Sequence, residues 1–151
     1  MATRSTIAME QPDGRIMQIY CHFDGYLSHH GSILQQHYRD SAKVLALMLL
    51  GDLSTLSAEI GQAHDFDAAY TGGDRHENWC MAYGRDRGEK NTDARVFRDW
   101  NDYVQNHQYE EFEYCYRRDG QWWVCERERG YAPLADAMAD ELHERLAMED
   151  E

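Results

Sequence analysis

The sequence lacks a long apolar run and an apolar leader, and these two absences bear on where the protein works. The stretch VLALMLL at residues 44–50 is far shorter than the roughly 20 apolar residues that a helix needs to cross a bilayer. The opening MATRSTIAME has no apolar segment of the kind that signal peptides carry. We therefore expect a cytoplasmic protein that does not enter a membrane.

Closely spaced cysteine pairs are also missing. The four cysteines form no CxxC motif, so the spacing typical of zinc fingers is not met. Because the cytoplasm is reducing, we expect free thiols or ligands and no disulfides. The cysteines are Cys21, Cys80, Cys115 and Cys125.

Positive charge is scarce. The chain has 15 Lys and Arg against 28 Asp and Glu, for a net charge of -13. Residues 76–151 hold 19 of the acidic and 10 of the basic residues. A field of this sign repels phosphates and anionic lipids, so direct binding to nucleic acid or membrane is not expected. Basic protein surfaces and cations remain as partners, and solubility alone is the plainer reason for the acidity.

What is present indicates one domain that spans residues 1–151. The chain is long enough to bury a core, and it is 42% hydrophobic and 12% aromatic. No internal repeat, low-complexity tract or linker divides it.

Two segments near the start predict a β-hairpin. Residues 5–10 and 15–22 suit strands, and Pro12-Asp13-Gly14 between them suits a turn. Further along, residues 79–84 predict a short strand, and residues 85–93 predict a charged turn.

The clearest hairpin turns at Asp119-Gly120, which we take as a two-residue turn. In that register Cys115 and Cys125 lie on opposite faces of the hairpin. Trp123 is then expected in the core, and Trp122 is the indole that we expect to be exposed.

Helical periodicity marks three longer segments. The first, SAKVLALMLL, is capped by Asp40 or Ser41 and ended by Gly51. The second, DARVFRDWNDYVQNH, is capped by Thr92, and the third has Pro133 in its first turn. The apolar face expected on the first helix is Val44, Leu45, Met48 and Leu49, that on the second is Val96, Trp100, Tyr103 and Val104, and that on the third is Leu134, Met138, Leu142 and Leu146.

The expected element order is ββααβαββα, in which the first α is a helical region that begins in HHGSILQQHY. Hairpins with interspersed helices predict an α+β fold, an antiparallel β-sheet built from hairpins with helices packed on one side.

Residues 19–38, IYCHFDGYLSHHGSILQQHY, are rich in histidine and tyrosine. His30 and His37 could share a helical face, but two turns separate them by about 10 Å, too far for one zinc ion. We therefore predict no metal and no cofactor, and a hydrogen-bonded corner of the fold instead. The chain also has no P-loop, GxGxxG or GxSxG motif, so no catalytic residue is predicted.

An alternative hypothesis is a small enzyme or ligand-binding protein whose pocket brings together His, Asp and Tyr side chains with two arginines of the YGRDRGE turn. The arginines could bind a carboxylate or phosphate, although a self-paired charged turn is the plainer interpretation. The residues of this alternative pocket are His22, Asp24, Tyr26, His30, Arg85 and Arg87.

The terminal helix suggests a second kind of site. Residues 134–151 carry seven carboxylates and one arginine, so the outer face of the helix is strongly acidic. We expect it to bind a host protein with a basic surface, through Asp136, Asp140, Glu141 and Glu144. A homodimer formed through the Trp122 face is a third possibility.

Several segments resemble a group of small proteins of bacteriophages, prophages and plasmids that have no established activity. The resemblance rests on TRSTI at residues 3–7, YCHFDGY at residues 20–26, AYGRDRGE at residues 82–89, YRRDGQWWV at residues 116–124, and the spacing of Gly31, Leu34, His37 and Tyr38. Phe23 stands where Trp is common in the group. The resemblance implies an accessory protein of a mobile element that acts in the host cytoplasm.

That context favours a host target such as a restriction or CRISPR nuclease complex, whose basic groove an acidic protein can occupy in place of DNA. The arginines that interleave the carboxylates weaken this comparison with DNA. They are Arg117, Arg118, Arg127 and Arg129.

Overall fold

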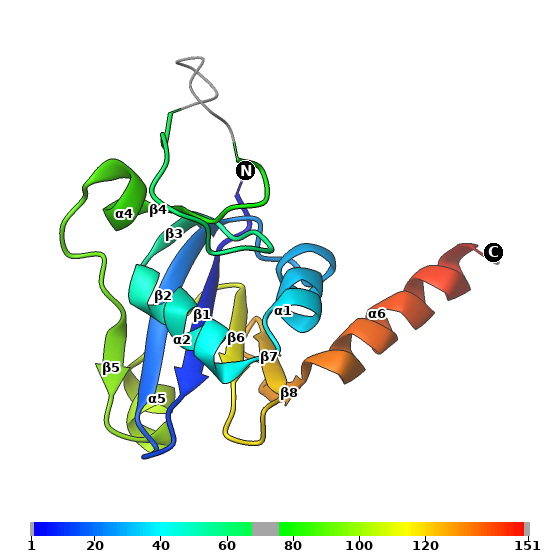
Figure 1. The fold of residues 1–151 in the computed structure, drawn as a ribbon. Coiled ribbons are helices and arrows are strands. Elements are labelled where there is room, and N and C mark those ends of the chain that lie inside the picture. Colours follow the sequence, from blue (N-terminus) through cyan, green and yellow to red (C-terminus); the bar gives the residue numbers. More distant parts are fainter. Residues whose placement is uncertain (1, 68–75, 150–151) are drawn as a thin grey trace.

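The protein folds around one eight-stranded sheet with helices on both faces (Figure 1). The structure is a computed structural model and describes residues 2–67 and 76–149. Its strands are β1 (Ser5–Glu10), β2 (Ile16–Phe23), β3 (Leu53–Thr55), β4 (Met81–Ala82), β5 (Arg95–Phe97), β6 (Phe112–Tyr116), β7 (Trp122–Glu126) and β8 (Tyr131–Pro133). Its helices are the π-helical turn η1 (Leu27–Gly31), α1 (Ser32–His37), α2 (Ser41–Leu50), α4 (Tyr83–Arg87), α5 (Trp100–Asn106) and α6 (Leu134–Glu149).

The α+β class is confirmed, but the sheet is mixed. The strands follow the order β4-β3-β2-β1-β6-β7-β8, and β5 pairs with the other end of β2. The β1–β6 and β2–β3 pairs are parallel, whereas the expected sheet was antiparallel throughout. The hairpins themselves are antiparallel, so the parallel pairs arise where separate hairpins and strands come together, which local sequence does not specify.

The first hairpin forms as the sequence predicts. Gln11 N–H donates to Arg15 O at 2.7 Å, and Gly14 takes a positive φ of 93° in the turn. Because β1 lies inside the sheet, both of its faces are covered: Ile7 packs against α1 and α2, and Ala8 packs on the opposite face with Tyr103 of α5. The expectation that helices cover one face only is therefore wrong.

The first long helix has the predicted ends and a different face. The Asp40 carboxylate accepts from Ala42 N–H at the start of α2. Gly51 ends the helix at φ 78°, where a Cβ would lie 2.2 Å from Thr92 O. The buried residues are Val44, Leu47 and Met48, whereas Leu45 and Leu49 are 37% and 71% exposed. Because leucines lie on all sides of this helix, its sequence does not specify which face is buried. The packing of the helix against the sheet selects that face.

The middle of the chain differs most from expectation. Only Met81–Ala82 of the predicted strand pairs as one, and the charged turn begins as the short helix α4. Thr92 caps no helix; β5 comes first, and α5 starts at Trp100 with the Asp99 carboxylate accepting from Asp102 N–H. The exposed Val96 belongs to β5 and not to a helical face.

The second hairpin is shifted by one residue from the predicted register. Tyr116 pairs with Trp122, because the turn holds Arg118, Asp119 and Gly120 between the bonded pair Arg117 and Gln121. A three-residue loop with glycine at positive φ replaces the two-residue turn.

One residue of slip inverts the faces of the strand that follows. Cys115 pairs with Trp123, so Cys115 and Cys125 lie on the same face and both remain free thiols. Trp122 is the buried indole, 6% exposed, and donates to Tyr38 O, whereas Trp123 is only half-buried. The expectation that Trp122 is exposed is therefore wrong, and its indole is not available for contact with a second copy.

Helix α6 leaves the body of the molecule (Figure 1). Its first turn is anchored, since Leu134 is fully buried and both Leu134 and Met138 approach Gly31 of η1. The rest of the helix points outward, away from the sheet. Among the described residues, no helix is both long enough and apolar enough to cross a membrane.

Candidate functional site

The four acidic residues predicted to bind a partner line one cleft. It lies between α6 and the edge of the sheet and has a volume of about 370 Å³. Glu126 of β7 and Arg129 of the following turn also line it, so the cleft holds five carboxylates against one guanidinium. Their helical spacing explains the convergence, because Asp136, Asp140 and Glu144 recur every fourth residue on one side of α6.

Helix α6 also exposes apolar side chains along its outer part. Leu142 and Leu146, which the sequence predicts to be core, are 52% and 49% exposed, and Met148 is 74% exposed. The helix leaves the sheet after its first turn (Figure 1), which agrees with the exposure of these side chains. Helix α6 therefore carries carboxylates on the side that lines the cleft and exposed apolar side chains on other parts of its surface.

The histidine-rich segment builds a corner of the fold, as expected, around His30. Its side chain is fully buried, with Nδ1 2.9 Å from Ser5 Oγ and Nε2 2.7 Å from Phe23 O. Because a carbonyl only accepts, Nε2 carries the proton and Nδ1 accepts from the serine hydroxyl. Burial, with the charge of His29 as a smaller cause, lowers the pKa of His30 to about 3, so the ring is neutral.

The other residues of the alternative pocket belong to separate contacts. His22 Nδ1 bonds the Tyr20 hydroxyl, and Tyr26 is 43% exposed with its ring against His29. Asp24 lines a different cavity, of about 650 Å³, together with His29, His64 and Trp79.

The two arginines of that alternative are tied to their own loop. Arg85 donates to the Asp86 carboxylate and to the carbonyls of Ile60 and Cys80, which uses most of its donors within the protein. Arg87 lies near Glu89 at 3.8 Å and over the Phe66 ring. The structure does not bring the six residues together.

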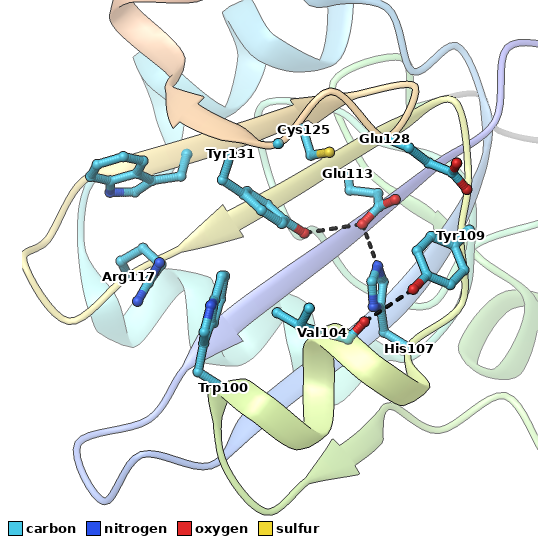
Figure 2. Close-up of a pocket in the computed structure, with 11 residues that line it drawn as sticks. Trp100, Val104, His107, Tyr109, Glu113, Arg117, Cys125, Glu128 and Tyr131 are labelled. Atoms are coloured by element: carbon cyan, nitrogen blue, oxygen red, sulfur yellow. Dashed lines mark hydrogen bonds and ion pairs between the residues drawn. The ribbon is translucent and has the colours of Figure 1, made fainter.

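A pocket that the sequence did not suggest lies on the face of the sheet covered by α5 (Figure 2). Its volume is about 570 Å³. Trp100 and Val104 of α5 form one side, and Tyr131 of β8 lies across from them (Figure 2). Trp123 of β7 also lines the pocket. Glu113 of β6 and His107 lie beneath, and Arg117 stacks on the Trp100 ring at 3.7 Å.

Two buried charges lie at the bottom of this pocket. The side chains of His107 and Glu113 are 4% and 2% exposed, and His107 Nε2 lies 2.5 Å from Glu113 Oε1. His107 Nδ1 is 2.6 Å from Tyr103 O, which can only accept. Nδ1 is therefore protonated, and a second proton is shared with Glu113.

The charges on this pair follow from its surroundings. Burial alone would lower the pKa of His107, but the hydrogen bond and charge of Glu113 and the Tyr103 carbonyl outweigh it, so the pKa is raised. The raised pKa favours the imidazolium form of His107. The Tyr131 hydroxyl donates to the same Glu113 oxygen at 3.1 Å, and burial raises the pKa of Tyr131, which keeps it a donor.

The arrangement favours binding over covalent chemistry. Cys125 lines the pocket, but burial raises the pKa of its thiol, which disfavours the nucleophilic thiolate. No group of three His, Cys, Asp or Glu side chains that could hold a metal ion occurs within residues 2–67 and 76–149.

Sequence reasoning missed His107 and Glu113, although one signal was present. In the strand FEYCY, alternation places Glu113 on the same face as Cys115, between aromatic neighbours. A glutamate at an inward position of a buried strand needs a partner. That partner, His107, precedes it by six residues and comes from the end of α5, which the sequence did not place correctly.

Comparisons with known proteins return no match. No protein-family model, no curated protein and no solved structure is found similar to this chain.

Proposed function

We propose that this protein is an accessory protein of a phage or other mobile element that binds a host protein with a basic surface. The binding surface is α6 together with the acidic cleft. The observation that carries the proposal is the placement of Asp136, Asp140, Glu141 and Glu144 in one cleft, on a helix that also exposes apolar side chains at Leu142, Leu146 and Met148.

The two parts of the surface supply different contributions to binding. The exposed apolar side chains of α6 offer surface whose burial against a partner is favourable by roughly 25 cal/mol per Å². The carboxylates steer a cationic partner and reject an acidic one, which raises the association rate and the specificity. A second copy of this chain would bring like charges together, so the surface favours a different protein.

The partner class follows from the sign of the charge. Proteins that hold nucleic acid present basic grooves, and a defence nuclease complex of the restriction or CRISPR kind has such a groove. Arg129 in the cleft is a counter-charge that a pure mimic of DNA would not need. We therefore propose that the protein binds the basic groove of its partner as an acidic protein ligand and contacts it through helix α6.

The test uses charge reversal of three carboxylates, Asp140→Lys, Glu141→Lys and Glu144→Lys, in a tagged full-length chain. Proteins captured from a bacterial host lysate are identified by mass spectrometry, with and without added double-stranded DNA. We expect the unmodified protein to capture a nucleic-acid-binding protein that added DNA displaces. The triple variant should lose that protein.

A matched control carries three reversals at exposed carboxylates near the opposite edge of the sheet: Glu77→Lys, Glu89→Lys and Asp93→Lys. It has the same net charge as the test variant, so it separates the surface from the total charge. Equal capture by the test variant and the unmodified protein would overturn the proposal. Equal loss in both variants would reduce it to a non-specific charge effect.

A further inference from the structure

The pocket between α5 and the sheet contains an acceptor without a donor. Glu113 Oε1 accepts from His107 and Tyr131, but Glu113 Oε2 has no hydrogen-bond partner among the described residues. The side chain is only 2% exposed and lines the pocket. Glu113 Oε2 is not a fully buried oxygen, so it can be reached from the pocket, where a bound molecule can donate a hydrogen bond to it.

The pocket walls are flat and aromatic. Trp100, Trp123 and Tyr131 line it, and the two indoles are both partly accessible. The Arg117 guanidinium already lies 3.7 Å from the centre of the Trp100 ring, which shows that a planar cation fits against this surface. A flat ligand that bears N–H groups could stack against the same aromatic side chains in the way that Arg117 does.

The charges around the pocket leave one carboxylate unbalanced. Arg117 pairs with Glu10 at 3.2 Å, and His107 pairs with Glu113. Glu128 also lines the pocket and has no ion pair among the described residues. In Figure 2, Glu128 and Glu113 lie toward the same end of the pocket, away from Arg117. A net charge of -13 over the whole chain adds to the attraction for a cation.

The backbone at Glu128 is also unusual. Arg127 and Glu128 have φ values of 50° and 66° in the turn between β7 and β8, and Arg129 N–H donates to Glu126 O at 3.0 Å. Such turns favour Asn and Gly, because side chains at positive φ are strained. A glycine at position 128 would therefore relieve this strain.

From the accessible carboxylate oxygen, the aromatic walls and the charges around the pocket, we propose that the pocket binds a small planar cation of the guanidinium or amidinium class. Its N–H groups would donate to Glu113 Oε2 and to Glu128, and its flat face would lie against the aromatic walls. The pocket is separate from the acidic cleft, with which it shares only Gly130, so the inference stands independently of the proposed function.

The test is a titration with benzamidine, followed by tryptophan fluorescence and by NMR chemical shifts. We expect saturable binding with a Kd of about 1 mM or tighter, which is reasonable for a ligand of this size. Benzamide has the same shape without the charge and should bind at least tenfold more weakly. Absence of saturable binding of benzamidine up to about 20 mM, or equal binding of benzamide, would overturn the proposal.

One variant separates binding from folding. Glu128→Gly removes the carboxylate and suits the positive φ, so it should raise the melting temperature while weakening benzamidine binding at least threefold. Trp123→Leu should weaken binding as well, whereas the control Phe23→Leu, a partly exposed aromatic residue outside the pocket, should not. Unchanged affinity in both Glu128→Gly and Trp123→Leu would place the ligand elsewhere and overturn the proposal.

Two further probes distinguish the source of the cation. Agmatine represents a free small molecule, and a blocked peptide with a single arginine represents a protein side chain. Binding of agmatine alone assigns the pocket to a small molecule. Binding of the peptide, with loss in Glu128→Gly, assigns it to an arginine of a protein. If neither agmatine nor the peptide binds, the guanidinium part of the proposal is wrong.

Discussion

Two histidines take opposite charge states in this protein for reasons that lie in their hydrogen bonds. His30 accepts from Ser5 and donates to a carbonyl, so the neutral ring satisfies its surroundings. His107 faces a carbonyl and a carboxylate, so only the imidazolium satisfies them. Burial disfavours the charge at both sites, and it prevails only at His30, where no carboxylate bonds the ring.

The low pKa of His30 predicts an acid-sensitive fold. Its pKa is about 3 in the folded protein and near 6.5 when unfolded, so the unfolded state binds the proton first. The stability that neutral His30 contributes is complete above pH 6.5 and is lost as pH falls toward 3. Between pH 7 and pH 5 the free energy of unfolding should fall by up to about 1.4 kcal/mol per pH unit below 6.5.

Urea unfolding at pH 5, 6 and 7 measures this slope. His30→Gln should flatten it, whereas the exposed His143→Gln should leave it unchanged. His107 does not mask the effect, because its raised pKa keeps its contribution constant below about pH 6.5. An equal slope in His30→Gln would show that another group titrates.

At the scale of elements, α6 has two parts with different roles. Its first turn completes the core, since Leu134 packs beside η1 and joins the main hydrophobic cluster. Beyond Met138 the same apolar spacing continues into solvent. The apolar residues that recur every four positions along α6 therefore lie in two environments: the first are part of the core, and the later ones are available to a partner.

This division predicts different effects for the same substitution at two positions of α6. Leu134→Ala leaves a cavity in the core and should lower the free energy of unfolding by about 2–5 kcal/mol. Leu142→Ala removes a half-exposed side chain and should change it by less than about 0.5 kcal/mol. Urea unfolding of the two variants provides the comparison, and a large loss in Leu142→Ala would mean that the outer part of α6 packs against the body.

Sequence patterns located most elements and failed where tertiary contacts decide. Caps and turn residues placed both ends of α2 and the first hairpin, because those signals act within a few residues. The loop at Arg118–Gly120 shows the limit: the same Asp-Gly pair fits a two-residue or a three-residue turn. Because the loop has three residues, Trp122 lies in the core and not at the surface, where the two-residue turn would place it.

The sites divide in the same way. The acidic residues of α6 share one cleft because regular helical spacing brings them together, and this can be derived from the sequence. The His107–Glu113 pair joins the end of α5 to β6, and its pocket also needs Trp100 and Tyr131 from other elements. No local pattern specifies how α5 lies on the sheet, so this pocket could only be found in the structure.

At the scale of the whole molecule, the excess of negative charge acts in two opposing ways. Individual carboxylates pair with arginines, as Asp52 does with Arg95 at 2.7 Å and Glu10 with Arg117 at 3.2 Å. Both of these pairs are partly buried, whereas exposed pairs such as Asp13 with Arg15 contribute about 0–1 kcal/mol each. The 13 unbalanced negative charges repel one another over longer distances, and this repulsion destabilises the compact state.

Added salt should therefore stabilise the protein. Raising sodium chloride from about 20 mM to about 200 mM shortens the screening length from about 20 Å to about 7 Å, which weakens long-range repulsion more than it weakens contacts at 3 Å. We expect the melting temperature to rise by a few degrees. In a variant with Asp136→Asn, Asp140→Asn, Glu141→Gln and Glu144→Gln the rise should be smaller, because four of the charges are gone. A melting temperature that falls with salt would mean that the ion pairs outweigh the repulsion, and the acidity would then serve partner binding or solubility without a cost in stability.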